Sequence, residues 1–173
     1  MTRSLLADAF DHHVWATLTL FDTLADLSDE QLQTSVPGTY GSILETVQHL
    51  VQADCSYLNV IGGGSRPRVE DEETMGVAQL RAEMEVNGTA WTEVLDEELD
   101  PEEELLRIRD DGSTLLAPKG IRLAQALHHG TDHRSQICTA LTQLGIEPPL
   151  IDVWDFGFSQ NRLVETEPTI APG

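Results

Sequence analysis

The sequence is poor in aromatic residues and in cysteine, and each shortage excludes a class of protein. Aromatic residues make up only 5% of the 173 residues, whereas Ala, Leu, Glu and Gln recur through long stretches. Such residues favour helices over strands. The composition therefore predicts a mostly helical protein, and the length fits a single domain, which we take to span residues 1–173.

The two cysteines, Cys55 and Cys138, lie far apart in the sequence and form no CxxC pair. A disulfide framework and a thiolate zinc cluster are therefore unsupported. We interpret both residues as small core side chains in a reducing compartment.

Basic residues are also scarce, with ten Lys and Arg against thirty Asp and Glu, for a formal net charge of -20. A surface of this charge repels phosphate backbones and anionic lipid headgroups, so we expect neither nucleic acid nor a membrane as a partner. No apolar run reaches the roughly 18 residues that span a bilayer, and the N-terminus lacks the pattern of a signal peptide. The sequence thus predicts a soluble, cytoplasmic protein.

Four long segments carry apolar residues at three- and four-residue spacing, which is the pattern of helices that share a core. They are residues 4–27 with Ser4 as N-cap, 42–61 with a Ser42–Glu45 capping box, about 75–99, and 119–144. The stretch "RIRDDGSTLL" predicts a short hairpin before the last long helix, and residues 153–163 predict a short C-terminal helix. The pattern indicates an all-α four-helix bundle whose connectivity is not simple up-and-down.

Three of the six histidines fall in "HHGTDHRSQ", residues 128–136, on the fourth predicted helix. A helix advances about 100° per residue, which places His129 and His133 together on the stripe that faces the bundle. His128 and Asp132 fall on the polar side, where we interpret them as a solvated pair. The same count on the second helix places His49 at the edge of the apolar stripe, from where it can face the core.

Three imidazoles aimed at one interior are hard to satisfy with apolar neighbours, because an unsatisfied buried ring nitrogen costs about 1 to 3 kcal/mol. A divalent cation would occupy one nitrogen of each ring, and histidines four residues apart on a helix can reach one ion at roughly 2.1 Å. Three protein ligands leave positions open for water or substrate. His49, His129 and His133 are the candidate metal ligands, and ordinary core or surface histidines are the competing interpretation.

The segments "ILETVQHLVQAD" (43–54) and "HGTDHRSQI" (129–137), which hold these histidines, resemble the DinB/YfiT-like family. The opening "DHHVWATLTLFDTL" (11–24) and the closing "LGIEPPLIDVWDFG" (144–157) extend the resemblance over nearly the whole chain. The resemblance implies a four-helix bundle with crossed, up-down-down-up connectivity. It also implies a divalent metal, commonly zinc or nickel, held by His49, His129 and His133.

Relatives of this kind include thiol-dependent enzymes, among them bacillithiol S-transferases and mycothiol-dependent isomerases. The resemblance therefore implies a small-molecule substrate and, as a second candidate cofactor, a low-molecular-weight thiol that the metal activates. A hydrolase that activates water would use the same three ligands. No general base stands out in the sequence, so a non-catalytic dimeric bundle that binds metal structurally or sequesters a ligand stays open. We expect a homodimer.

Further side chains near these segments carry weaker expectations. His13 could face the cavity, but we expect it to be a satisfied core histidine. We expect Gln136 to hydrogen-bond a ligand, to line the site or to be exposed. Arg134 is expected to reach a carboxylate of the acidic third helix or of a partner subunit. Three aromatic residues near the C-terminus could close a pocket, form a dimer contact or pack in the ordinary way: Trp154, Phe156 and Phe158.

Overall fold

The computed structural model describes residues 5–67, 75–109 and 111–166. Its long helices are α1 (Leu5–Leu24), α3 (Ile43–Ile61), α4 (Val77–Asp96) and α5 (Lys119–Gln143). Two short helices accompany them, α2 (Asp29–Leu32) and α6 (Val153–Ser159). Strands β1 (Glu104–Ile108) and β2 (Thr114–Pro118) pair antiparallel as a hairpin between α4 and α5.

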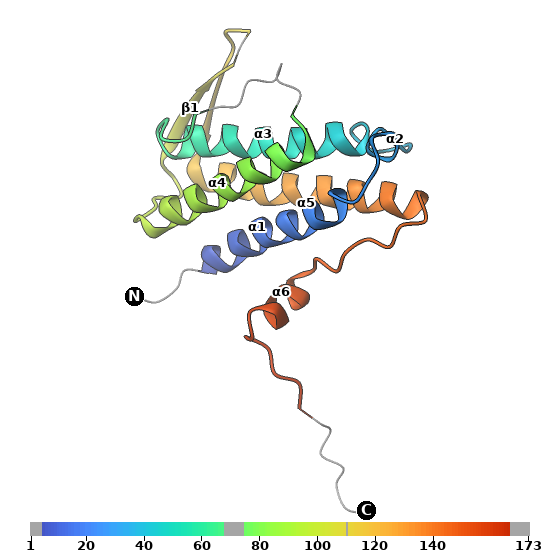
Figure 1. Ribbon diagram of the computed structural model, residues 1–173. Helices are drawn as coiled ribbons and strands as arrows, with labels where there is room; N and C mark the ends of the chain where they lie inside the picture. The colour runs from blue at the N-terminus through green and yellow to red at the C-terminus, as the bar shows by residue number, and fades with distance from the viewer. Residues whose placement is uncertain (1–4, 68–74, 110, 167–173) are drawn as a thin grey trace, which may run out of the picture.

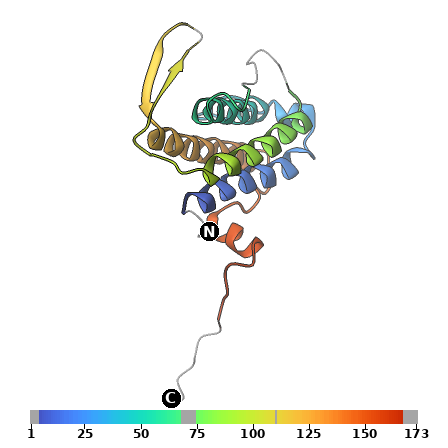
Figure 2. The same ribbon diagram turned by 90° about the vertical axis from the view of Figure 1, so that its left-hand side faces the viewer.

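The four long helices form a bundle in which α3 packs against α4 and α5, and α1 packs against the same two helices. Helices α1 and α5 run in one direction and α3 and α4 in the other (Figure 1). This order is up-down-down-up, so the predicted all-α four-helix bundle with crossed connectivity is confirmed. The β1–β2 hairpin extends away from the bundle beside the C-terminal end of α3 (Figures 1 and 2).

Local sequence signals explain most of the helix boundaries. The predicted capping box is present, since Ser42 Oγ accepts from the Glu45 N–H at 3.2 Å and Glu45 Oε2 accepts from the Ser42 N–H at 2.8 Å. The first helix ends at Leu24, earlier than predicted, because a second capping box at Ser28 and Gln31 begins the short α2. The predicted N-cap Ser4 lies outside the described residues.

The other predicted elements are present with shifted ends. The third long helix is Val77–Asp96, shorter than the predicted 75–99, and the short C-terminal helix ends at Ser159. Both cysteines are free, as expected. Among the described residues, none of the helices combines the length and the apolar character that crossing a bilayer takes.

The interior of the bundle holds two apolar clusters with polar side chains between them. One cluster includes Leu20, Val47 and Ile137, and the other includes Phe10, Leu58 and Trp91. On each long helix, a buried polar residue falls between its contributions to the two clusters. We call these residues the polar layer: His13 on α1, Asp54 on α3, Asn87 on α4 and Arg134 on α5.

Candidate metal centre

Three histidines from two adjacent helices turn their Nε2 atoms toward one point. His129 Nε2 lies 3.2 Å from His49 Nε2 and 3.1 Å from His133 Nε2. One ring nitrogen of each residue lies within 4.8 Å of those of the others, an arrangement that could hold a metal ion. The structure thus brings together the three residues that the sequence singles out, and their role as ligands stays a prediction.

The spacing of these nitrogens agrees with shared coordination of one ion. Two ligands at about 2.1 Å from an ion are about 3.4 Å apart in a tetrahedral site. They are about 3.0 Å apart at adjacent positions of an octahedral site. The observed separations of 3.1 and 3.2 Å fall between these values.

Hydrogen bonds to Gln136 fix which nitrogen of His133 carries its proton. Gln136 Oε1 lies 3.2 Å from His133 Nδ1 and 2.8 Å from the Tyr40 backbone nitrogen, and an amide oxygen only accepts. A neutral His133 therefore carries its proton on Nδ1 and presents a lone pair at Nε2. A proton on His129 Nε2 can serve only one of its two neighbours, whereas a cation serves all three nitrogens, so the donor set fits a divalent ion.

The surroundings of His129 and His133 favour the neutral form of the imidazole, which is the form that binds metal. Burial, followed by the neighbouring His133 and His49, lowers the pKa of His129 to about 4. Burial also lowers the pKa of His133, while its hydrogen bond with Gln136 acts in the opposite direction. A metal-binding imidazole must be deprotonated, so no proton has to leave His129 or His133 at neutral pH.

His49 and His129 line a cleft of about 840 Å³ between α3, the segment that precedes it and β1. This volume lies in the range of small-molecule sites. Tyr40 stacks on His49, with ring centroids 4.1 Å apart and an angle of 9° between the planes. Tyr57 stands edge-on to His129 at 5.8 Å. Two of the three candidate ligands are therefore in contact with a space that a substrate can enter.

The model of the DinB family matches residues 1–168. The chain belongs to the DinB family. The protein is also similar to the crystal structure of a DinB-like protein from Bacillus cereus ATCC 10987, with 19% sequence identity and a TM-score of 0.67. That similarity covers 85% of this chain and 95% of the other, and it shows a common fold. No curated protein matches this sequence.

Three cleft residues of this DinB-family chain were not predicted from its sequence: Tyr40, Glu45 and Arg107. Glu45 lies one helical turn before His49, and this four-residue spacing would have found it, although the capping box explained it first. Tyr40 lies in a turn, where no periodicity reports the direction of a side chain. Arg107 reaches the cleft only because the hairpin folds beside α3.

The sequence also predicted the environments of three other residues of "HHGTDHRSQ" in this DinB-family bundle: His128, Asp132 and Gln136. His128 and Asp132 are exposed, as expected for a solvated pair. Gln136 is half-buried rather than fully exposed, and its Oε1 accepts from Nδ1 of His133, one of the three candidate metal ligands. Near the C-terminus, Phe156 packs on Trp15 with ring centroids 5.5 Å apart, which is ordinary packing.

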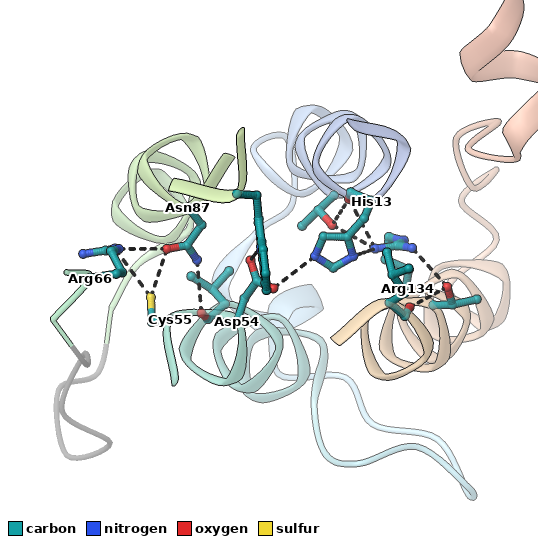
Figure 3. Close-up of polar contacts among 11 residues, drawn as sticks. His13, Asp54, Cys55, Arg66, Asn87 and Arg134 are labelled. Carbon is teal, nitrogen blue, oxygen red and sulfur yellow. Dashed lines mark hydrogen bonds and ion pairs between the residues drawn. The ribbon is translucent and has the colours of Figure 1, made fainter. Parts of the chain in front are cut away.

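His13 is the core histidine that the sequence predicted (Figure 3). Its Nδ1 accepts from the Arg134 guanidinium at 3.0 Å, and its Nε2–H donates to Asp54 Oδ1 at 3.2 Å. Asp54 Oδ2 accepts from the Trp91 indole N–H at 2.9 Å. Both ring nitrogens of His13 therefore have partners within the protein.

The expectation for Arg134 is wrong. Its side chain is only 3% exposed and donates to His13 and Thr17 of α1 instead of reaching a carboxylate of the third long helix or a partner subunit. The cause is Gly130, where an added Cβ would lie 2.3 Å from His13 Cε1. The bare glycine lets α1 come close, and the guanidinium then contacts α1. Burial lowers the pKa of Arg134 to about 10, so it remains charged at neutral pH.

Proposed function

We propose that this DinB-family protein is a metal-dependent enzyme that acts on a small molecule. His49, His129 and His133 are the ligands of one divalent ion, with zinc or nickel as the candidates. The observation that carries the proposal is the convergence of three Nε2 atoms beside a cleft of about 840 Å³ that His49 and His129 line. A purely structural ion would instead be enclosed by protein ligands.

A divalent ion held by these three histidines would supply Lewis-acid chemistry, which lowers the pKa of a thiol or a water molecule. The protein's own groups arrange the donors. Gln136 keeps the proton of His133 on Nδ1, and the ring of Tyr40 lies flat against His49 and limits its rotation. Two reaction types use this arrangement, transfer of a low-molecular-weight thiol to an electrophile and hydrolysis by water.

Glu45 would be available to accept a proton from a substrate thiol or from water in the cleft. It is the one carboxylate among the described residues that line the cleft. Hydrogen bonding to Ser42 lowers the pKa of Glu45, which keeps it ionised at neutral pH. A weak base of this kind would suit an acidic nucleophile such as a thiol better than it suits water.

The test is a reaction screen on protein reconstituted with zinc or nickel. One arm offers cysteine-derived and sugar-linked thiols with an electrophilic bimane, and the other offers chromogenic esters and amides. We expect turnover in one arm that a chelator abolishes, that His49→Ala loses, and that the exposed His128→Ala retains. A rate that survives both chelation and His49→Ala would contradict the proposal. Metal binding without turnover in either arm would favour the non-catalytic dimeric bundle instead.

A further inference from the structure

The cleft beside the histidines contains one cationic side chain whose role the proposed chemistry leaves open. Apart from histidines, Glu45 and Arg107 are the charged residues among the described residues lining it. Glu45 is held by the capping box at the start of α3. Arg107 enters from β1, which packs against α3 near the other end of that helix (Figure 1).

Arg107 has no hydrogen-bond or ion-pair partner within the described parts of the chain. That is unexpected in a protein where thirty acidic residues are available to ten basic ones. Every other described Lys and Arg side chain makes at least one hydrogen bond or ion pair. They are Arg66 and Arg81 on carboxylates of α4 and α1, Arg109 on Ser113, Lys119 on Glu103, Arg122 on backbone carbonyls, Arg134 in the polar layer and Arg162 on Asp8.

The strand geometry explains why Arg107 lies on the cleft side of the hairpin. Side chains alternate along β1, so Leu105 and Arg107 are half-buried while Leu106 and Ile108 are exposed on the opposite face. Antiparallel pairing of Arg107 with Leu115 holds this register. The direction of the guanidinium is thus set by the fold and not by a local partner.

A second cation adds to the positive potential around Arg107. Burial, followed by the charge of Arg107, lowers the pKa of Arg122, which lies at the start of α5. The guanidinium of Arg122 donates to the carbonyls of Leu105 and Leu115, so it holds the two strands and leaves Arg107 uncompensated. An anionic ligand in the cleft would therefore bind Arg107 rather than Arg122.

We propose that Arg107 binds a carboxylate group of the substrate, whose opposite end reaches the three-histidine centre. This inference rests on the proposed function for the role of the histidines. Arg107, His49 and His129 line the same cleft, so one bound molecule can contact the guanidinium and the histidine centre together. The substrate is accordingly an acid whose reacting group and carboxylate are separated by the span of the cleft from the histidines to Arg107.

A carboxylate fits this site better than a phosphate. One guanidinium offers a planar pair of donors that matches a carboxylate. A phosphate group would bring about two negative charges and call for additional donors. The net charge of -20 further opposes a doubly charged group.

The first arm of the test uses the metal-free protein, so it does not depend on the histidine centre. Pentanoate, pentyl phosphate and pentanol are titrated while the arginine side-chain NMR signals are followed. We expect pentanoate to shift the Arg107 signal, pentyl phosphate to shift it less, and pentanol to leave it unchanged. Equal shifts of Arg107 and Arg109, no shift with pentanoate, or a larger shift with pentyl phosphate would overturn the proposal.

The second arm uses the cobalt- or zinc-loaded protein and mercaptoalkanoates of increasing length, each paired with the matching mercaptoalcohol. We expect an optimal length at which the acid binds about tenfold more tightly than the alcohol, as a charged hydrogen bond provides. Arg107→Gln should remove this preference and Arg107→Lys should restore part of it. Arg109→Gln, which makes the same charge change on an exposed neighbour, should keep it.

Loss of the preference in both glutamine variants, or an unchanged preference in Arg107→Gln, would overturn the carboxylate subsite while leaving the metal centre intact. Failure of the protein to bind metal would contradict the proposed function alone. In that case the NMR titration still decides whether Arg107 binds a carboxylate.

Discussion

Two histidine clusters lie in the same bundle, and they differ in what satisfies their ring nitrogens. His13 is buried in the polar layer, and Arg134 and Asp54 satisfy both of its nitrogens. The Nε2 atoms of His49, His129 and His133 face one another beside a cleft. Buried polar side chains that hydrogen-bond to one another stabilise the fold. Ring nitrogens that face one another, with too few N–H groups to pair them all, indicate a bound ligand.

The two clusters also differ in the elements that they join. Through Trp91 and Thr17, the polar layer links all four long helices, whereas the three histidines link only α3 and α5. Damage to the polar layer should therefore appear as lost stability, and damage to the three histidines as lost metal binding. The predictions that follow separate these outcomes.

The largest effect is expected from Asp54→Ala, which removes the carboxylate that faces His13 and Trp91. The buried donors of His13 and Trp91 lose their acceptor, which costs about 1 to 3 kcal/mol for each, and the buried Arg134 loses a nearby negative charge. Urea unfolding of the metal-free protein measures the change, with the exposed Asp132→Ala as control. A loss below about 1 kcal/mol would mean that the polar layer does not hold the helices together.

Gln136→Leu should have an intermediate effect, on metal affinity and not on stability. It removes the acceptor that keeps the proton of His133 on Nδ1. Loss of such a partner typically weakens metal binding about tenfold to a hundredfold. Competition with a chromophoric chelator gives the affinity, and Gln143→Leu at the exposed end of α5 is the matched control. Equal affinities for both variants would show that Gln136 does not orient the ligand.

The fold and the candidate metal ligands could be predicted from local sequence patterns. Helical periodicity and the Ser42–Glu45 capping box predicted the bundle, because both signals are local and repeated. The advance of about 100° per residue placed His129 and His133 on one face of a helix. The same rule applied to the second predicted helix placed His49 where it can face the core. Each of these steps needs only the regular geometry of a helix.

The sequence failed where side-chain position depends on how elements pack. Arg134 lies toward α1 because Gly130 permits a close approach of two helices, which no single-helix count contains. Arg107 lines the cleft because the hairpin folds beside α3, and Tyr40 stacks on His49 from a turn. These are tertiary consequences, so the ligand set was predictable while its surroundings were not.

A smaller effect is expected in the pH dependence of the metal-free protein. The pKa of His129 is lowered from 6.5 to about 4 by burial and by neighbouring histidines. Between these values the unfolded chain binds more protons than the folded one, so stability falls as pH falls from about 6.5 toward 4. Unfolding curves across this range should show this dependence, and His129→Ala should flatten it. An equal slope in the variant would contradict the assignment to His129.

We propose that the three converging imidazoles hold a metal ion. The most direct test is metal analysis of untagged protein after zinc or nickel loading, for wild type, His129→Ala and the adjacent exposed His128→Ala. We expect close to one ion per chain in wild type and in His128→Ala, and almost none in His129→Ala. Equal metal content in the two variants, or none in wild type, would contradict it.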